Sequence, residues 1–321
     1  MRLDHSTIDA LGSRVVGRRR EIELIVAALA AERHILLEGP PGTGKSTLLR
    51  ALAQALGLAF TFVEGNAELT PARLVGHFDP AQVLTEGYRP DVFVDGPLVS
   101  ALRHGSLLYV EEINRVPEET LNLLITVMSE GELHVPRLGM VMAGEGFRLV
   151  AAMNPFDAVG TARISAAIYD RVCRLSMGYQ SAAEEAAIVT THTDGTTDGI
   201  GAASSAPSAP LPQAFVSGVV EVVRATRAHV DIRVGSSVRG AIDLVRVAAS
   251  LAALRGTRTD QYGVGLDAAL VALSGRIRLH ESCGRSAEEI VTELWSTTFA
   301  PPPTNGEEGP PSAGPPTPGK A

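Results

Sequence analysis

The amino-acid sequence predicts an α/β fold in which a parallel five-stranded sheet is sandwiched by helices and followed by a small all-α domain. Within residues 1–180, five short apolar segments have the character of parallel strands covered on both faces, and helical patterns alternate with them. After Tyr179 the patterns become helical. The predicted strands cover residues 34–37, 60–63, 107–110, 147–153 and 172–177.

The helices are predicted from the spacing of apolar residues and from boundary signals. Residues 47–56 place four leucines along one helical face directly after the first strand. Two capping boxes, each a serine followed three residues later by a glutamate, begin helices at Ser181 with Glu184 and at Ser286 with Glu289. Three further helices are predicted over residues 215–229, 237–254 and 266–280.

Changes in composition predict the domain boundaries. Residues 194–212 are rich in Gly, Ser, Ala, Thr and Pro, which is typical of a mobile surface loop. Eight of the last 21 residues are proline, which favours a disordered tail. We therefore expect an α/β domain over residues 1–180, a helical domain over 181–299 and a disordered tail over 300–321.

Charge and cysteine content argue against several classes of function. The 321 residues carry a formal net charge of −8, which disfavours non-specific nucleic-acid binding because that requires a basic face. Two cysteines cannot form a disulfide framework and indicate a reducing compartment. The sequence has no apolar signal segment and no long uncharged apolar run. We expect a soluble, cytoplasmic protein without membrane insertion or a nucleic-acid partner.

Residues 39–46 read GPPGTGKS and match the phosphate-binding pattern G-x-x-x-x-G-K-[ST] between a predicted strand and a predicted helix. Backbone N–H groups and the helix dipole can hold phosphate oxygens there. Lys45 is expected to reach the β- and γ-phosphates, and Ser46 to bind Mg²⁺. Of the 28 basic residues, 26 are arginine and only Lys45 and Lys320 are lysine, so Lys45 needs a local reason. The residues predicted to bind ATP here are Gly39, Pro40, Pro41, Gly42, Thr43, Gly44, Lys45, Ser46 and Thr47.

The strand over residues 107–110 ends in two adjacent acids, Glu111 and Glu112. In a phosphate-loop protein, a second strand that ends in acids lies beside the loop. Glu111 is then expected to hold the Mg²⁺ shell, and Glu112 to orient and deprotonate the attacking water. The alternative is that both are helix-start acids, favoured by the dipole of a following helix.

The order of the motifs resembles that of the MoxR-type AAA+ ATPases, which are close to the magnesium chelatase motor subunit and to CbbQ- and GvpN-type activases. The motifs are GPPGTGKST, PARLVG, DGPL, LLYVEEINR, AAMNP and YDR, and the likeness runs from about residue 15 to about residue 282. The resemblance implies a P-loop AAA+ core with a helical lid, ATP and Mg²⁺ as cofactors, and assembly into a homo-hexamer.

The resemblance also implies roles for five residues outside the loop. Val16 and Gly17 match the segment that lines the adenine pocket. Asn154 matches sensor 1, near the γ-phosphate and the attacking water. Arg171 matches the arginine finger, which acts on a neighbouring subunit's nucleotide, and Arg239 matches sensor 2 of the lid. From the residues alone, Asn154 could instead belong to a strand-end turn, and the two arginines could be ordinary surface residues.

Three structural expectations remain. Residues 77–97 and 130–146 match the two insertions of this group, which in relatives face the partner or the central pore, and the second reads as a hairpin. Cys173 lies in a predicted strand and is expected to be a small core residue rather than a reactive thiol.

The leading functional hypothesis is an Mg·ATP-driven ring motor that remodels or activates a partner protein, for example in maturation or metal-cofactor insertion. MoxR relatives often act with a partner that bears a von Willebrand A domain, so such a partner and a protein client are expected. The family usually has aspartate where this chain has Glu111. This departure motivates one alternative, a nucleotide-dependent scaffold or switch with little hydrolysis. A magnesium chelatase motor subunit is the third hypothesis.

Overall fold

The structure is a computed structural model that describes residues 5–155, 164–193 and 211–300. The chain divides into two compact units, residues 1–208 with 237–242, and residues 209–236 with 243–321. All but two residues of the predicted loop and all but one of the predicted tail lie outside the described residues. No helix in the described part of the chain is both long and apolar enough to cross a membrane.

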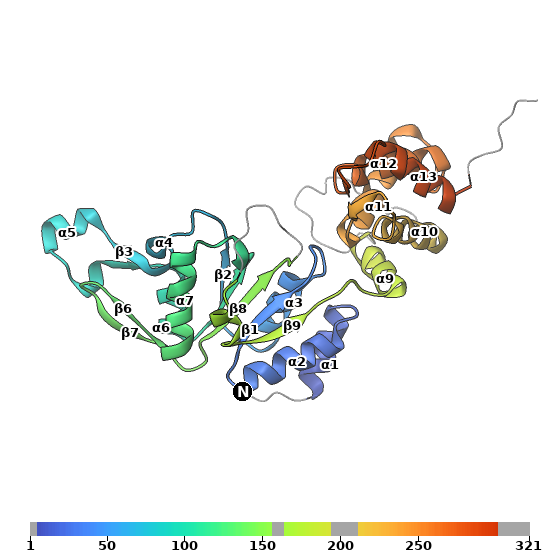
Figure 1. Ribbon diagram of the computed structural model, residues 1–321. Helices are drawn as coiled ribbons and strands as arrows, with labels where there is room; N and C mark the ends of the chain where they lie inside the picture. The colour runs from blue at the N-terminus through green and yellow to red at the C-terminus, as the bar shows by residue number, and fades with distance from the viewer. Residues whose placement is uncertain (1–4, 156–163, 194–210, 301–321) are drawn as a thin grey trace, which may run out of the picture. The chain divides into compact units, whose positions relative to one another are not determined.

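The first unit is built on a five-stranded parallel sheet with the strand order β2-β5-β8-β1-β9 (Figure 1). The strands are β1 (His34–Glu38), β2 (Phe60–Glu64), β5 (Leu107–Glu111), β8 (Arg148–Met153) and β9 (Val172–Ser176). All four pairings between neighbouring strands are parallel. The predicted fold class is therefore confirmed, and each predicted strand is observed with its ends shifted by at most one residue.

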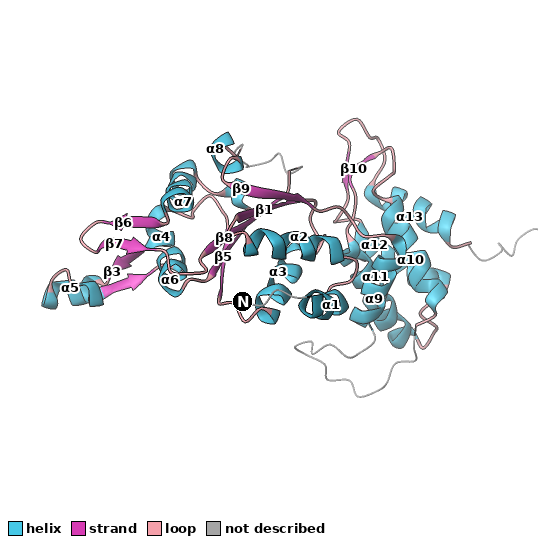
Figure 2. Cartoon of the chain, turned by 90° about the horizontal axis from the view of Figure 1, so that it is seen from below, coloured by secondary structure: helices cyan, strands magenta, loops and turns pink. Residues whose placement is uncertain are grey.

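Helices cover both faces of this sheet (Figures 1 and 2). Ile35 and Leu37 of β1 belong to the core on one face, and Leu36 belongs to the core on the other. Because both faces are buried, the strands read as continuous apolar runs. The first face packs against α1 (His5–Arg14), α2 (Arg19–Ala30) and α3 (Lys45–Ala55), and the second against α4 (Pro71–Val75), α6 (Pro97–His104) and α7 (Glu118–Glu130).

The edge strand β9 departs from this rule. Cys173 is exposed, so the prediction that it is a core residue is wrong. None of the five residues of β9 is fully buried. A strand at the edge of a sheet has a neighbour on one side only, and less of its surface is covered. Apolar periodicity alone does not tell an edge strand from a central one.

Two insertions extend the first unit at the end away from α1 and α2 (Figure 1). The predicted hairpin is confirmed as the antiparallel pair β6 (Glu132–Val135) and β7 (Gly139–Met142). The other insertion contains the antiparallel pair β3 (Gly76–Phe78) and β4 (Phe93–Asp95), with α5 (Pro80–Glu86) between them. A shallow apolar cleft with a volume of about 340 Å³ lies between the two insertions.

The second unit is built mainly of helices, with one addition. Its helices are α10 (Gln213–Ala225), most of α11 (Val238–Arg255), α12 (Tyr262–Leu273) and α13 (Ala287–Thr298), while α9 (Ala182–Thr193) precedes it in the first unit. The addition is an antiparallel pair of short strands, β10 (Ile232–Val234) and β11 (Arg278–Leu279). The helix predicted to reach residue 280 ends at Leu273, because β11 pairs with β10 instead.

Both capping boxes are present. The Ser286 side chain accepts a hydrogen bond from the Glu289 backbone N–H, and the Glu289 carboxylate accepts one from the Ser286 N–H. At the start of α9, Glu184 Oε2 accepts from the Ser181 N–H at 2.8 Å, and the Glu184 N–H donates to Ser181 Oγ at 3.3 Å. These local signals therefore predicted two helix starts correctly.

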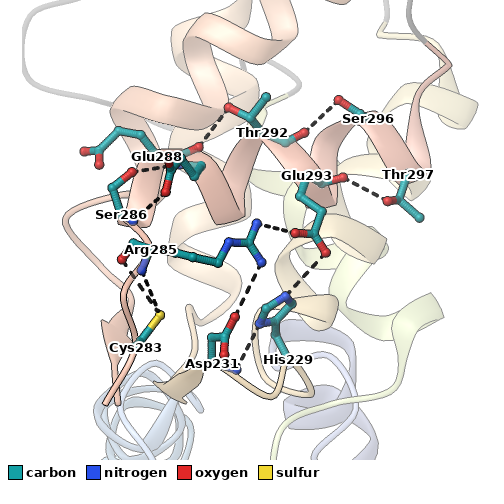
Figure 3. A network of polar contacts seen from close by, with 11 residues as sticks. His229, Asp231, Cys283, Arg285, Ser286, Glu288, Thr292, Glu293, Ser296 and Thr297 are labelled. Atoms are coloured by element: carbon teal, nitrogen blue, oxygen red, sulfur yellow. Dashed lines mark hydrogen bonds and ion pairs between the residues drawn. The ribbon is translucent and has the colours of Figure 1, made fainter. Parts of the chain in front are cut away.

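Arg285 joins the turn before α13 to two other segments of the second unit (Figure 3). Its guanidinium contacts Asp231, at 3.4 Å, and Glu293 of α13. The hydrogen bond from Arg285 lowers the pKa of Glu293. His229 Nε2 lies 3.6 Å from the same glutamate. The carboxylates and the guanidinium are partly exposed, so we expect this network to orient the turn rather than to supply much stability.

His34, at the start of β1, is a partly buried histidine that the fold holds in its neutral form. Its Nδ1 accepts a hydrogen bond from the Leu149 backbone N–H at 2.9 Å, so the Nδ1 atom carries no proton. Burial lowers the pKa of His34 to about 4, and the Arg148 guanidinium acts in the same direction. Protonation therefore competes with the hydrogen bond that joins the ring to β8.

We predict that the free energy of unfolding falls as the pH drops from about 6.5 to about 4, because the unfolded chain then binds a proton on His34 that the folded chain does not. The loss from this group should be on the order of 2 kcal/mol. Denaturant unfolding at several pH values should show a smaller acid-dependent loss for His34→Asn than for the wild type. His104→Asn, at an exposed histidine, is the control. An equal loss in all three proteins would contradict the prediction.

Candidate nucleotide-binding site

The strand order brings three of the predicted site segments to one edge of the sheet. The phosphate loop follows β1, Glu111 ends β5 with Glu112 directly after it, and Asn154 follows β8. Since β8 lies between β5 and β1 and all three strands are parallel, their carboxyl ends meet at one edge. Ligands of α/β sheets bind outside the carboxyl ends of the strands.

The phosphate loop has the backbone that its glycines predict. Gly42 and Gly44 adopt the left-handed region, with φ of 76° and 82°, and α3 begins at the next residue, Lys45. Gly39 is required for another reason, because a Cβ atom there would lie 2.2 Å from the Met177 carbonyl oxygen. The turn and the helix start are thus determined by residues of the motif.

Lys45 is buried beneath this loop, with only 9% of its surface exposed. Its Nζ donates hydrogen bonds to the carbonyl oxygens of Gly39, at 2.8 Å, and Pro40, at 3.0 Å. Burial lowers the pKa of Lys45 to about 8, and the nearby Glu111 carboxylate opposes that effect. A buried ammonium that donates to loop carbonyl oxygens is well placed to be stabilised by an anionic ligand.

Ser46 and Glu111 meet between α3 and β5. Ser46 Oγ donates to Glu111 Oε1 at 2.6 Å, and Ser46 Oγ lies 3.3 Å from the hydroxyl oxygen of Tyr109. Burial raises the pKa of Tyr109, so its hydroxyl keeps its proton. A serine hydroxyl and a carboxylate, adjacent and beside a phosphate loop, are oxygen donors of the kind that Mg²⁺ prefers, so these residues fit the metal.

Glu112 has an unusual backbone. Its φ of 52° lies in the left-handed region, which is uncommon for a residue with a side chain. The Arg115 guanidinium lies 3.1 Å from its carboxylate, and both side chains are partly exposed. The 3₁₀ turn of Ile113–Arg115 follows directly. Glu112 precedes this 3₁₀ turn, but its side chain makes no capping hydrogen bond there, so a role as an ordinary helix-start acid does not explain the backbone.

Arg18 is a residue of the site region that none of the sequence motifs predicts. It is 3% exposed, and its Nη2 atom donates to the carbonyl oxygens of Thr43, at 2.9 Å, and Gly178, at 2.7 Å. Arg18 thereby ties the Val16–Gly17 segment, predicted to line the adenine pocket, to the phosphate loop. Three arginines stand in a row here, and each has a glutamate three or four residues later, so nothing in the sequence distinguishes Arg18 from its neighbours.

Of the remaining predicted residues, Asn154 lies at the site edge, where its carbonyl oxygen accepts a 3.4 Å hydrogen bond from Asn114 Nδ2. Gly17 adopts a left-handed φ of 71°, and a Cβ atom there would overlap the Glu184 carboxylate. Arg239 lies in the first turn of α11, at the boundary of the two units. The roles of Val16, Gly17, Asn154 and Arg239 stay predictions.

The structure does not bring Arg171 to the phosphate loop of its own chain. Arg171 precedes β9, where Val172 pairs with the first residue of β1, whereas the loop follows the last residue of β1. The two ends of a five-residue strand are about 13 Å apart. Arg171 is held there by Ser129 Oγ, which accepts from its Nε at 2.5 Å, and by the Ala167 carbonyl oxygen at 2.8 Å.

A buried carboxylate connects the Arg171 segment to the loop. Glu38, the last residue of β1, is 3% exposed. Its carboxylate accepts hydrogen bonds from the Tyr169 hydroxyl at 2.8 Å and from Arg174 Nε at 2.5 Å. Tyr169 and Arg174 flank Arg171 in sequence. The residue before the first glycine of the loop is thus bonded to both sides of the segment that carries Arg171.

Comparisons with known proteins agree with this geometry. Residues 34–172 match the AAA domain family of the dynein-related subfamily. The uncharacterized protein YeaC of Bacillus subtilis is 30% identical over 306 residues, which cover 89% of this chain and 91% of YeaC. An uncharacterized protein of Staphylococcus epidermidis is 34% identical over 155 residues, 48% of this chain and 58% of that protein.

Two solved structures share the fold. A protein of Cytophaga hutchinsonii described as a candidate ATPase has a TM-score of 0.50 and 22% identity, covering 90% of this chain and 92% of that one. A RuvB variant of Thermotoga maritima has a TM-score of 0.53 and 18% identity, covering 80% of this chain and 70% of that one.

The sheet, the phosphate loop and the family match define the chain as a P-loop protein of the AAA+ ATPase family. Within it, the chain belongs to the family that includes YeaC. Membership implies nucleotide binding at the edge of the sheet described above.

Gly65 offers a test of how tightly the acids of β5 are held. Its N–H donates to the Glu111 carbonyl oxygen at 2.7 Å, and a Cβ atom at this position would lie 2.5 Å from the Glu112 carbonyl oxygen. We predict that Gly65→Ala lowers the free energy of unfolding by about 2 kcal/mol, because the backbone of both acids must shift. Thermal and denaturant unfolding would measure the loss.

Gly263→Ala is the matched control, because nothing lies within 4 Å of a Cβ atom at that helical position. It should leave stability unchanged or raise it slightly. Equal stabilities for the two variants would show that the segment around Gly65 is not tightly packed against Glu111 and Glu112.

Proposed function

We propose that this protein is an Mg²⁺-dependent ATPase of the MoxR type, which works as a homo-hexameric ring and remodels or activates a partner protein. The observation that carries the proposal is the contact between Ser46 and Glu111, which stands beside Lys45 and the phosphate loop. It joins a hydroxyl and a carboxylate suited to Mg²⁺ with a cation suited to phosphate.

In this proposal each residue at the edge of the sheet has one task. Lys45 exchanges its bonds to loop carbonyls for bonds to the β- and γ-phosphates. Ser46 and Glu111 hold the metal, which when bound neutralises charge on the phosphate oxygens. Glu112 accepts the proton of the attacking water, and Asn154 orients that water.

The proposed ring follows from the separation between Arg171 and the phosphate loop. An arginine that stabilises charge on the transferring phosphoryl group must reach it, and Arg171 lies at the opposite end of β9 from the loop. A neighbouring subunit can supply the missing contact through a head-to-tail interface, and repeated interfaces of that kind close into rings.

The proposed client is a protein. At the insertion end, Leu84, Val94, Met140 and Met142 are exposed apolar residues, and Leu84 is exposed by 87%. Together with the apolar cleft between the insertions, they give this end the character of a protein-binding surface. A von Willebrand A domain partner, a cytoplasmic location and the absence of a nucleic-acid partner belong to the same proposal.

A second candidate, a nucleotide-dependent switch with little hydrolysis, is favoured by one observation. The Glu112 carboxylate is paired with Arg115 at 3.1 Å, and this ion pair occupies the carboxylate that would have to face an attacking water. In that case ATP would bind and order the chain without efficient turnover.

The two candidates differ in what Glu112→Gln does. For the ATPase, we predict that steady-state phosphate release falls at least about a hundredfold, while ATP binding stays within about threefold of the wild type, because only the proton acceptor is lost. Lys45→Ala should weaken binding itself. A phosphate-release assay and equilibrium binding measure both. Phosphate release by the wild type that does not exceed the Glu112→Gln level would favour the switch.

For Arg171→Ala, we predict that the purified variant binds ATP normally but inhibits wild-type subunits when the two are mixed. One variant subunit removes the arginine from its neighbour's site, so activity should fall more steeply than the wild-type fraction. Arg73→Ala is the control, because Arg73 is an exposed arginine paired with Glu68. A linear fall in activity on mixing would argue against action on a neighbouring subunit.

A further inference from the structure

We propose that Tyr109 is a positioning residue for the divalent cation, whose hydroxyl orients Ser46 and Glu111 so that their oxygen atoms face one cation. The inference rests on the proposed function, because it takes Mg·ATP as the ligand. The phosphate-loop motif and the acid pair contain no tyrosine, so neither motif predicts a role for Tyr109.

The aromatic ring of Tyr109 cannot move freely. Tyr109 lies in the central region of the sheet, on β5, and is fully buried. Its ring packs against Phe60 and Phe62 of the neighbouring strand β2, with ring centroids 5.8 Å and 5.7 Å away. Side chains two residues apart on a strand point to the same face, so Tyr109 and Glu111 face α3 together. The packed apolar ring therefore fixes the position of the hydroxyl group in the site.

A count of protons determines the direction of the hydrogen bonds. Ser46 has one hydroxyl proton, and it donates that proton to Glu111 Oε1 at 2.6 Å. In the contact of 3.3 Å between Ser46 Oγ and the Tyr109 hydroxyl, Tyr109 must then be the donor. One lone pair of Ser46 Oγ accepts from Tyr109, and one remains for a cation. Tyr109 thus fixes the direction in which Ser46 presents that lone pair.

The same chain of bonds restrains Glu111. A glutamate side chain has three rotatable bonds, and ordering it costs more conformational entropy than ordering a shorter acid. Tyr109 holds Ser46, and Ser46 holds Glu111 Oε1, so the carboxylate keeps one orientation beside Ser46. Partners behind the ligands commonly change metal affinity by 10- to 100-fold.

A buried tyrosine hydroxyl usually has a hydrogen-bond partner, because burying it unpaired is costly. This need alone would explain the contact between Tyr109 and Ser46. The two roles predict different results. If Ser46 merely satisfies the phenol, removing the hydroxyl changes stability and leaves the cation requirement unchanged. If Tyr109 positions the ligands, removing the hydroxyl weakens cation binding while nucleotide binding without metal stays intact.

The test is Tyr109→Phe, which keeps the ring and removes only the hydroxyl. Binding of a fluorescent ATP analogue would be measured in EDTA and across a range of Mg²⁺ concentrations, and Mn²⁺ binding to the nucleotide complex by electron paramagnetic resonance. We expect the Mg²⁺ concentration for half-maximal tight binding to rise about tenfold and Mn²⁺ affinity to fall similarly. Affinity in EDTA should stay within twofold of the wild type.

Tyr262→Phe is the matched control, because the Tyr262 hydroxyl lies 2.8 Å from Ser296 Oγ in the second unit, and its loss should change neither quantity. Thermal unfolding of both variants reports whether the fold is kept. An unchanged Mg²⁺ requirement, or an equal loss of affinity with and without metal, overturns the role of Tyr109. A wild type whose nucleotide binding does not depend on metal overturns the proposed function as well.

Discussion

The parallel pairing of β8 with both β1 and β5 is the constraint on which the site depends. Through β8, the loop after β1 and the acids at the end of β5 face one another across Asn154. The hydrogen bond from Ser46 to Glu111 then ties α3 to β5. Residues separated by more than 60 positions in sequence become neighbours only because these strands share a direction and a register.

Those parts of the fold that depend on local chemistry were predictable from the sequence. Gly42 and Gly44 have the positive φ that the phosphate-loop pattern requires, and α3 begins directly after them. The capping boxes at Ser181 and Ser286 form between residues three positions apart. The strands were predictable because burial on both faces leaves a continuous apolar run. In each case the local structure is determined by a few residues that are neighbours in sequence.

What the sequence could not predict depends on contacts between distant residues. The exposure of Cys173 follows from the position of β9 at the edge of the sheet, which only the strand order reveals. The pairing of β10 with β11 shortens α12 and joins residues more than 40 positions apart. Arg18 is buried while its neighbour Arg19 is exposed, because Arg18 alone reaches Thr43 and Gly178. In the sequence, Tyr109 resembles the apolar residues around it in the strand. Only the structure reveals that its hydroxyl lies beside Ser46.

Although Arg171 lies far from the phosphate loop of its own chain, the hydrogen bonds of Glu38 connect the two segments. A buried carboxylate is costly unless it is paired, and Glu38 is paired only through Tyr169 and Arg174 among its hydrogen bonds in the described residues. These two residues flank Arg171, and Gly39 of the loop follows Glu38 directly. A shift of the loop on ligand binding that moves Glu38 would therefore disturb its bonds to Tyr169 and Arg174, on either side of Arg171. In a head-to-tail assembly, the same carboxylate would make the position of Arg171 at one site depend on the ligand at the next.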